Sequence, residues 1–286
     1  MKQIFVSFLF ICFLLLNQST LKADTSPNSS ITIFAHGLGG HAGHIRRYQE
    51  HRIIHGDAHT FDVYGRMSQV SLGQQHEMGN LDNAIQHIVR TKLDNQIILR
   101  GLSMGAATIA NYLGSYPDTS AIKGAILESP FADVDGILND IINKSFSLSV
   151  INAICPYFKE LGVYCIYRNH TLDGIQPIKV AHLIPKHIPI LLIASQEDTL
   201  IPLHSTQKMY NALVQSGHTK THILIVKHGA HAKMCFHKKS YKTIRNVEHA
   251  FRKKYNLGNY INSYAIAGEQ ALAATQPAVS NSEDIQ

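Results

Sequence analysis

Residues 98–107 read Ile98-Leu99-Arg100-Gly101-Leu102-Ser103-Met104-Gly105-Ala106-Ala107. An apolar strand pattern leads into G-x-S-x-G, and small residues that suit a closely packed helix follow. This order is typical of the nucleophile elbow, a strained strand-to-helix turn that exposes the hydroxyl of its serine. We expect Gly101 and Gly105 where the backbone bends sharply and a Cβ would clash with neighbouring segments. The stretch therefore marks Ser103 as the candidate nucleophile.

A serine hydroxyl is a weak nucleophile near neutral pH, so it needs a base and a carboxylate that orients the base. In elbow-type sites the acid follows the serine along the chain, and the histidine comes last. Asp198 follows the predicted strand 188–194, and His231 follows the predicted strand 222–226. Ligand sites in open α/β sheets collect at the carboxyl ends of strands. We therefore predict a catalytic triad of Ser103, Asp198 and His231.

Other residues compete for two of these roles. Glu128 could orient the histidine, but the Asp-x-x-x-Pro turn lies one strand before the candidate histidine and favours Asp198. His228 competes with His231, and the histidine that follows Gly-Ala is preferred. Two further acids are weaker candidates for the carboxylate: Glu197 and Asp133.

Acyl transfer also needs two fixed backbone N–H donors for the oxyanion. One is expected from Met104, directly after the nucleophile, and the other from Leu38, in the loop after the first predicted strand. That loop reads His-Gly-Leu-Gly-Gly over residues 36–40. A phosphate cradle is disfavoured, because the spacing G-x-G-x-x-G with a following acid is not convincingly present. The residues expected to support the elbow and the loop are His36, Gly37, Gly39, Gly101 and Gly105.

The segments around the elbow alternate between strand and helix patterns. Helices are expected over about 78–89, from the elbow to near 114, and over 203–216. This alternation predicts an α/β fold with a right-handed, mostly parallel sheet of about six strands and helices on both faces. The expected strands are 31–35, 61–64, 96–100, 122–127, 188–194 and 222–226.

Three further segments divide the chain. Residues 1–23 are typical of a signal peptide, with Lys2 before an apolar run that is too short to span a bilayer. Residues 136–185 are too long for an ordinary connection, and we interpret them as a small helical cap over the site. Residues 259–286 are rich in Ala, Ser and Gln, so we expect a disordered tail. The catalytic domain is therefore expected over residues 24–258.

The signal segment predicts export, to the periplasm or the medium, and an uncleaved membrane anchor is the alternative. Removal of the segment leaves Cys155, Cys165 and Cys235. An odd number of cysteines leaves at least one free thiol or an intermolecular partner. A local disulfide between Cys155 and Cys165 is a plausible hypothesis.

The net charge is +6, and basic residues concentrate between residues 233 and 254. We interpret them as a solvated helix face, with weak attraction to an anionic membrane surface as the alternative. Nucleic acid is not expected as a partner, because no binding motif accompanies the charges. His51, His55 and His59 recur every fourth residue, and on a helix they could present a metal-binding face. A polar helix or loop is the favoured interpretation, so no metal or cofactor is predicted.

The spaced motifs HGLGG, GLSMGAA, SQEDTLIP and HGAHA resemble those of the α/β-hydrolase superfamily over about residues 31–255. The stretch from Ser71 to Ala84 and the run Glu128-Ser129-Pro130-Phe131 are similar to its small serine hydrolases, which include prolyl-oligopeptidase-like and acyl-(thio)esterase-like proteins. The resemblance implies the α/β-hydrolase fold. The antiparallel hairpin that begins the larger family sheet is expected to be absent, so the sheet should be minimal.

These observations favour an exported serine hydrolase that cleaves a small-molecule acyl ester or thioester through an acyl-enzyme on Ser103. The alternative is a serine peptidase or amidase that uses the same residues. A third hypothesis is a non-catalytic, histidine-rich binding protein that keeps the fold. The acyl chain, the leaving group and the oligomeric state are not specified by the sequence.

Overall fold

The computed structural model describes residues 29–63, 70–92, 96–137 and 174–275. Six parallel strands form one sheet in the order β2-β1-β3-β4-β5-β6. Among the described residues every strand pairing is parallel, as the sequence predicts for a minimal sheet. The strands are β1 (Ser30–Ala35), β2 (Ala58–Thr60), β3 (Gln96–Leu102), β4 (Ile122–Glu128), β5 (Ile190–Ser195) and β6 (Thr221–Val226).

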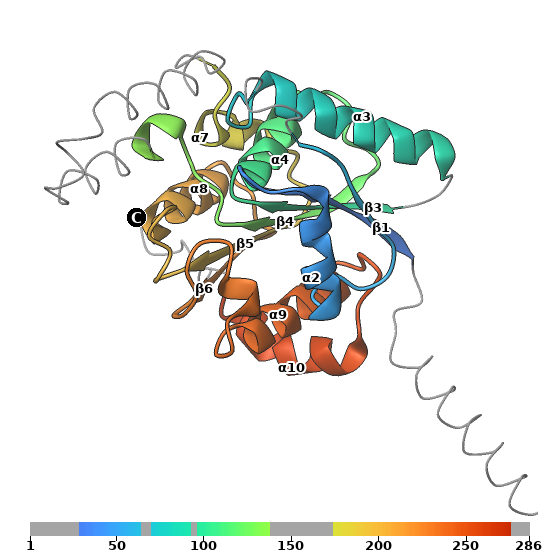
Figure 1. Ribbon diagram of the computed structural model, residues 1–286, viewed down its shortest axis with the longest axis vertical. Coiled ribbons are helices and arrows are strands. Elements are labelled where there is room, and N and C mark those ends of the chain that lie inside the picture. The colour runs from blue at the N-terminus through green and yellow to red at the C-terminus, as the bar shows by residue number, and fades with distance from the viewer. Residues whose placement is uncertain (1–28, 64–69, 93–95, 138–173, 276–286) are drawn as a thin grey trace, which may run out of the picture.

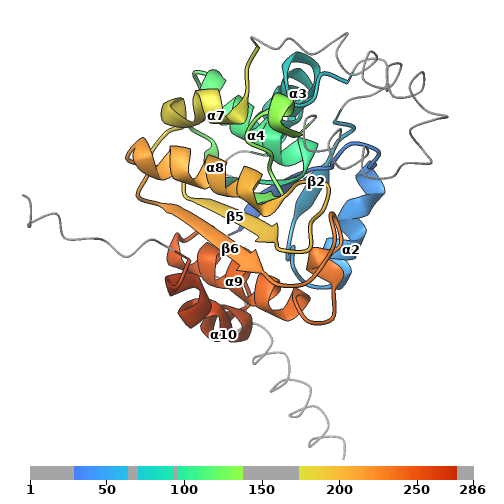
Figure 2. The ribbon, with the colours of Figure 1, turned by 90° about the vertical axis from the view of Figure 1, so that its left-hand side faces the viewer.

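Helices cover both faces of this sheet, which confirms the predicted layers (Figures 1 and 2). One face carries α3 (Gln75–Thr91), α4 (Met104–Ser115), α7 (Pro177–Val180) and α8 (Leu203–Gln215). The other carries α2 (Ile45–Glu50), α9 (Tyr241–Lys254) and α10 (Asn262–Ala273). Three short 3-10 turns complete the described elements: η1 (Ala42–His44), η4 (Ala181–Leu183) and η5 (Met234–Phe236).

The alternation of side chains along β3 explains why both faces need a helical layer. Ile97 and Leu99 pack in the core under α3 and α4, whereas Ile98 and Leu102 pack in the core above α9. A strand that buries side chains on both faces reads as a nearly continuous apolar run. β3 lies inside the sheet between β1 and β4, so its carboxyl end is surrounded by the loops of its neighbours.

The glycines of the elbow lie where the sequence analysis requires them. A Cβ on Gly105 would overlap the carbonyl oxygen of Ala35, and one on Gly101 would overlap the backbone of Ala106. α4 can therefore pass against β1 and β3 only with these two residues as glycine. The close approach brings the amino end of α4 to the carboxyl edge of the sheet.

The second strand differs from its predicted position. The prediction was residues 61–64, whereas β2 spans Ala58–Thr60 and pairs with β1 through Thr32↔Ala58 and Phe34↔Thr60. Val63 is buried after the strand has ended, and its backbone N–H donates to Nε2 of His36 at 3.3 Å. The apolar residue was therefore taken for a strand position although it packs beneath a loop.

The C-terminal prediction was wrong for residues 259–275, which continue the fold. α10 lies along α9, with Ala265, Gly268 and Leu272 buried. A Cβ on Gly268 would overlap the backbone of Asn246, so the glycine permits close contact between the two helices. The small residues that suggested low complexity form a tightly packed helix face.

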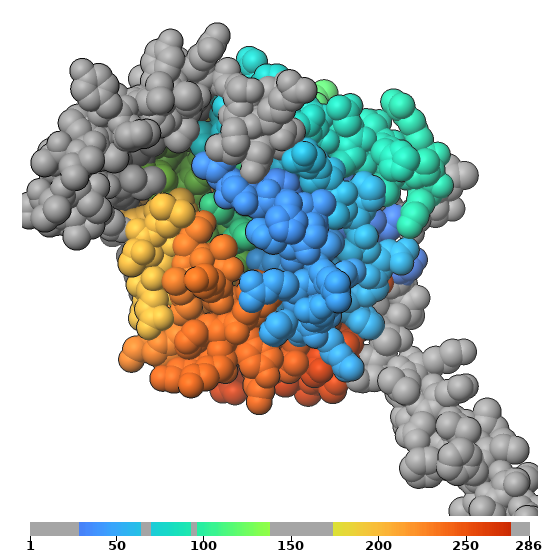
Figure 3. All heavy atoms as spheres, viewed as in Figure 1, coloured from blue at the N-terminus to red at the C-terminus, as the bar shows by residue number. Residues whose placement is uncertain are grey.

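Several predictions lie outside the described residues: the signal segment, Cys155 and Cys165, and most of the proposed cap. The described end of the cap segment, α7 and η4, packs against α4. In the part of the chain that the structure describes, we find no helix with the length and apolar character needed to cross a membrane. The loops after β1 and after β6, which are far apart in the sequence, lie side by side on one face (Figure 3).

Candidate active site

Ser103 occupies the turn between β3 and α4 in a strained conformation, with φ 55° and ψ −119°. A positive φ is uncommon for any residue with a side chain, and such strain is typical of the nucleophile elbow. Its backbone N–H donates to the carbonyl of Glu128 at 2.8 Å, and its carbonyl accepts from Ala107 at 3.0 Å. The turn is therefore fixed at both ends, at the carboxyl edge of the sheet.

Asp198 and His231 are brought together from the loops after β5 and β6. Nδ1 of His231 lies 2.9 Å from Oδ2 of Asp198. The other carboxylate oxygen accepts backbone N–H groups of Leu200 at 3.1 Å and Ile201 at 2.9 Å. The carboxylate is almost fully buried, whereas the imidazole is partly exposed. This arrangement fixes the ring of His231 and leaves Nε2 as its other nitrogen.

A fourth residue, Ser129, contacts the acid. Its Oγ donates to Oδ2 of Asp198 at 2.8 Å. The backbone of Ser129 has a φ of 47°, and its N–H donates to the carbonyl of Ile193 at 2.8 Å. The sequence analysis quoted this serine without assigning it a role. Its signal was available, because Ser129 directly follows β4 as the other site residues follow their strands.

The glycine loop after β1 closes against the serine. Gly40 N–H donates to the carbonyl of Gly37 at 2.9 Å, and Gly39 has a φ of +73° that favours glycine. A Cβ on Gly37 would lie 3.1 Å from Cβ of Ser103. The loop therefore approaches the serine within van der Waals contact of its side chain. Leu38 lines the same cavity as Ser103.

His36 holds this loop from below. Its side chain is fully buried, and Val63 N–H donates to Nε2. Nε2 must then be unprotonated, so Nδ1 carries the hydrogen and donates to the carbonyl of Gly37 at 2.9 Å. His36 is thereby a neutral bridge between the loop and the segment after β2, which is the supporting role that the sequence predicts.

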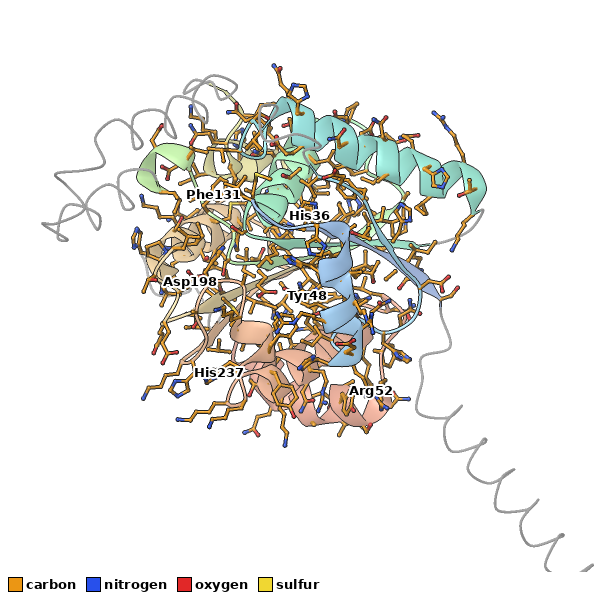
Figure 4. The ribbon with its side chains drawn as sticks, in the orientation of Figure 1. His36, Tyr48, Arg52, Phe131, Asp198 and His237 are labelled. Atoms are coloured by element: carbon orange, nitrogen blue, oxygen red, sulfur yellow. The ribbon has the colours of Figure 1, made fainter. Side chains whose placement is uncertain are left out.

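A cavity of about 250 Å³ opens beside Ser103. Ser103 and His231 both line it, so residues 128 positions apart in the chain share one space. Figure 4 shows Phe131 and Asp198 on neighbouring parts of this edge. The wall is mainly apolar and includes Leu72, Met104, Phe131, Val134, Ile137 and Ile201.

The alternative acids and base lie elsewhere. Glu128 is fully buried and binds Arg100 on the α9 side of the sheet, so it does not face His231. His228 pairs with Glu197 at 2.8 Å. The hydrogen bonds from Gly229 and His228 hold the pKa of the Glu197 carboxyl below its usual range. The fourth alternative acts within its own turn and near α8, through contacts with Gly136 and Lys208: Asp133.

A buried ionic cluster lies beneath the elbow. Nη2 of Arg100 lies 3.0 Å from Oε2 of Glu128 and 2.8 Å from Oε1 of Glu248. Tyr48 and the thiol of Cys235 both donate to Oε2 of Glu128, at 2.9 Å and 3.0 Å. Burial raises the pKa of the Cys235 thiol, which stays protonated as a donor. The cluster joins β3, β4, α2, α9 and η5, and therefore links the strand before the serine to the segment after His231.

The proposed metal-binding face is not formed. α2 ends at Glu50, so His51 caps the helix, His55 lies in the following turn and His59 lies in β2. The every-fourth-residue spacing therefore does not place the three side chains on one helix. Among the residues that the structure describes, no cluster of three metal-ligating side chains is present.

Comparisons with known proteins follow from this geometry. No family model matches the chain. Lysophosphatidylserine lipase ABHD12 from Mus musculus is 27% identical over 200 residues, which cover 67% of this chain and 47% of that protein. The protein from Xenopus tropicalis with the same name is 25% identical over 193 residues, 65% of this chain and 47% of that protein. This chain thus spans about half the length of the curated relatives it matches.

Among solved structures, the Pyrococcus furiosus esterase Pf2001 aligns with a TM-score of 0.60 at 15% identity, over 80% of this chain and 83% of that chain. The Pyrococcus horikoshii acylaminoacyl peptidase aligns with a TM-score of 0.56 at 15% identity, over 82% of this chain and 38% of that chain. At these identities the likeness concerns the fold.

Proposed function

This chain belongs to the α/β-hydrolase superfamily, and from that premise we propose that it is a serine hydrolase of carboxylic esters or thioesters. The observation that carries the proposal is the shared cavity: Ser103 and His231 line an apolar space, and Asp198 binds the far side of the imidazole. An acyl group fits an apolar wall, and a nucleophile with its base at the same wall is what acyl transfer requires.

In the proposed mechanism, Oγ of Ser103 attacks the carbonyl carbon of the substrate while Nε2 of His231 takes its proton. Asp198 holds the imidazole in this orientation and stabilises the imidazolium that forms. The backbone N–H groups of Leu38 and Met104 stabilise the oxyanion. The bond to the leaving group then breaks, and His231 returns the proton to the departing oxygen or sulfur. Water activated by His231 releases the acid and restores Ser103.

The cavity favours an acyl group over a polar one. Its wall presents Phe131, Val134 and Ile137 beside the serine. Each methylene removed from water contributes about 0.8 kcal/mol, so an extended acyl chain gains affinity along this wall. The relative named lysophosphatidylserine lipase supports a lipid ester as the substrate class. We therefore propose an acyl ester with an apolar chain as the small-molecule partner.

A substrate panel tests the proposal. The purified protein is assayed on p-nitrophenyl esters of increasing chain length, on an acyl thioester and on aminoacyl and prolyl p-nitroanilides. We expect turnover of the esters and thioester, with kcat/KM rising along the chain series, and amide turnover lower by at least about tenfold. Higher kcat/KM on the amides would instead support a serine peptidase. Absence of turnover and of labelling by an active-site serine reagent in folded protein would support a non-catalytic binding protein.

The N-terminal sequence supports export as part of this proposal. Lys2, the apolar run over residues 4–16 and Ala23 have the order of a cleavable signal. Amino-terminal sequencing of the protein recovered from its host is expected to start at or near Asp24. An intact amino terminus in a membrane fraction would instead support an anchor.

A further inference from the structure

We propose that the surface beside the cavity mouth binds an anionic lipid bilayer. The surface is defined by the exposed lysines Lys227, Lys233, Lys238, Lys239 and Lys242, and we call it the basic surface. Residues 221–247 contain these lysines and Arg245 and hold no aspartate or glutamate. Among the described residues, none of the five lysines lies within ion-pair distance of a carboxylate. The charges are therefore available to an external anion.

The basic surface adjoins the active-site cavity through the chain itself. His231 and Ala232 line the cavity, and Lys233 is the next residue. η5 and His237 then lead to Lys238 and Lys239, at the amino end of α9. Figure 4 shows His237 on the same view of the molecule as Asp198. A ligand bound at the basic surface would therefore lie close to the cavity mouth.

α2 extends this surface from the other side of the mouth. The guanidinium of Arg47 lies 4.3 Å from the ring centroid of Phe236, and the ring of His51 lies 5.1 Å from the same ring. Figure 3 shows the segment after β1 and the segment after β6 adjoining on this face. The positive charge thus belongs to one continuous region rather than to a single loop.

Carboxylates near this region are already engaged. Glu197 accepts the N–H of Gly229 and lies 2.8 Å from Nδ1 of His228. Glu50 pairs with Arg46 at 3.0 Å. These contacts reduce the repulsion that the two carboxylates would exert on an anionic surface.

Two large apolar side chains stand at the same mouth. Leu38 is 41% exposed and Leu200 is 44% exposed, and both line the cavity. Basic residues around exposed apolar side chains suit the interface of an anionic bilayer, where lysines meet headgroups and apolar side chains meet acyl chains. A nucleic acid would use the charges but not the leucines. The observations therefore favour a lipid surface.

In this arrangement a lipid ester would enter the cavity directly from the bilayer. That role of the cavity rests on the proposed function, whereas the binding of lipid does not. Each lysine near an anionic surface strengthens binding about fivefold, and the effect falls with added salt. Reversal of two lysines should therefore lower the affinity by at least about 20-fold.

The test measures co-sedimentation of the full chain with vesicles. The Ser103→Ala variant is used throughout, so that no lipid is consumed. Vesicles consist of phosphatidylcholine alone or of phosphatidylcholine mixed with phosphatidylglycerol. The doubly reversed variant Lys238→Glu/Lys239→Glu is compared with Lys123→Glu/Lys220→Glu, which makes the same charge change at exposed positions beside the starts of β4 and β6. The apolar run 4–16 is present in every variant, so differences report the lysines.

We expect binding to the anionic vesicles that weakens with salt, a loss of at least about 20-fold in the first variant, and less than about threefold in the control. Equal binding to both vesicle types, or equal losses in the two variants, would overturn the proposal. Binding to RNA as tight as to the vesicles, with no effect of Leu200→Ser on either, would identify a general polyanion surface and also overturn it. Hydrolysis of a soluble short-chain ester by the Ser103 form separates the two proposals, because failure of that assay leaves vesicle binding unaffected.

Discussion

Oδ2 of Asp198 accepts two side-chain hydrogen bonds, from Oγ of Ser129 at 2.8 Å and from the ring of His231 at 2.9 Å. With two backbone N–H groups on Oδ1, the carboxylate has four partners and little freedom to rotate. An ionised carboxylate accepts hydrogen bonds and donates none, so this environment suits the charged form. The position and the tautomer of His231 therefore follow from Asp198.

Replacement of Asp198 by asparagine tests this relationship. The amide keeps the size of the side chain but can no longer offer two charged acceptors, so the histidine loses its orienting partner. We expect kcat on a p-nitrophenyl ester to fall about 10³–10⁴-fold. Glu197→Gln is the matched control one residue away and should keep kcat within about threefold. Similar losses in both variants would contradict the assignment of Asp198.

The apolar wall predicts a chain-length effect. Val134 is buried and lines the cavity, so Val134→Phe should fill space that a long acyl chain needs. We expect kcat/KM on a p-nitrophenyl decanoate to fall at least about tenfold, with less than a threefold change (about) on the acetate. Val89→Phe places the same change on the exposed surface of α3 and should leave the profile unchanged. A uniform loss across all chain lengths would contradict this role of Val134.

The close approach of α4 to β1 predicts a large effect on stability. Gly105→Ala would force a Cβ into the carbonyl of Ala35, and we expect the free energy of unfolding to fall by about 3 kcal/mol or more. Gly79, in α3, has no atom near the position of an added Cβ, so Gly79→Ala should stabilise the protein by about 0.5–1 kcal/mol. Urea unfolding of both variants measures the difference. Comparable stability of Gly105→Ala and the parent would disprove the tight contact.

His249 predicts a loss of stability in acid. Its Nδ1 accepts the N–H of Ile261 at 3.0 Å, and its Nε2 donates to the carbonyl of Arg52 at 2.8 Å, so the buried ring is neutral. Burial lowers its pKa from 6.5 to about 4. As pH falls through this window, the unfolded chain takes up the proton first, so the free energy of unfolding declines.

The measurement is urea unfolding at about pH 7 and about pH 5. His249 should account for about 2 kcal/mol of the loss between them. His249→Gln should lose less stability over this interval by about that amount. His218 and His222, whose pKa values burial also lowers to about 4, keep their own share in the variant. An identical pH dependence in the two proteins would contradict the neutral, buried state of His249.

The elbow and the strands could be predicted because their signals are local. Gly101, Ser103 and Gly105 stand at fixed spacing, and the apolar runs that form β1, β3, β4, β5 and β6 are short and bounded by polar residues. Asp198 and His231 could be placed because each follows such a run. Parallel strands bring their carboxyl ends to one edge, and that rule alone joins residues from distant parts of the chain.

The remaining features depend on contacts that no local pattern contains. The bond from Ser129 to Asp198 joins residues 69 positions apart, and the pair of Arg100 and Glu248 spans 148 positions. The composition that suggested a disordered tail instead supports α10, because small residues such as Gly268 allow helices to approach closely. Tertiary packing decides these cases, since the same small or polar residues also suit solvent-exposed segments.

Site-mapped labelling with a fluorophosphonate probe tests the central claim most directly. The probe forms a covalent bond only with a serine whose hydroxyl is activated by a neighbouring base. We expect one equivalent on the wild-type chain, located by peptide mass mapping at Ser103, and none on Ser103→Ala. Stoichiometric labelling of folded Ser103→Ala, or a modified residue elsewhere in the wild-type chain, would contradict the account.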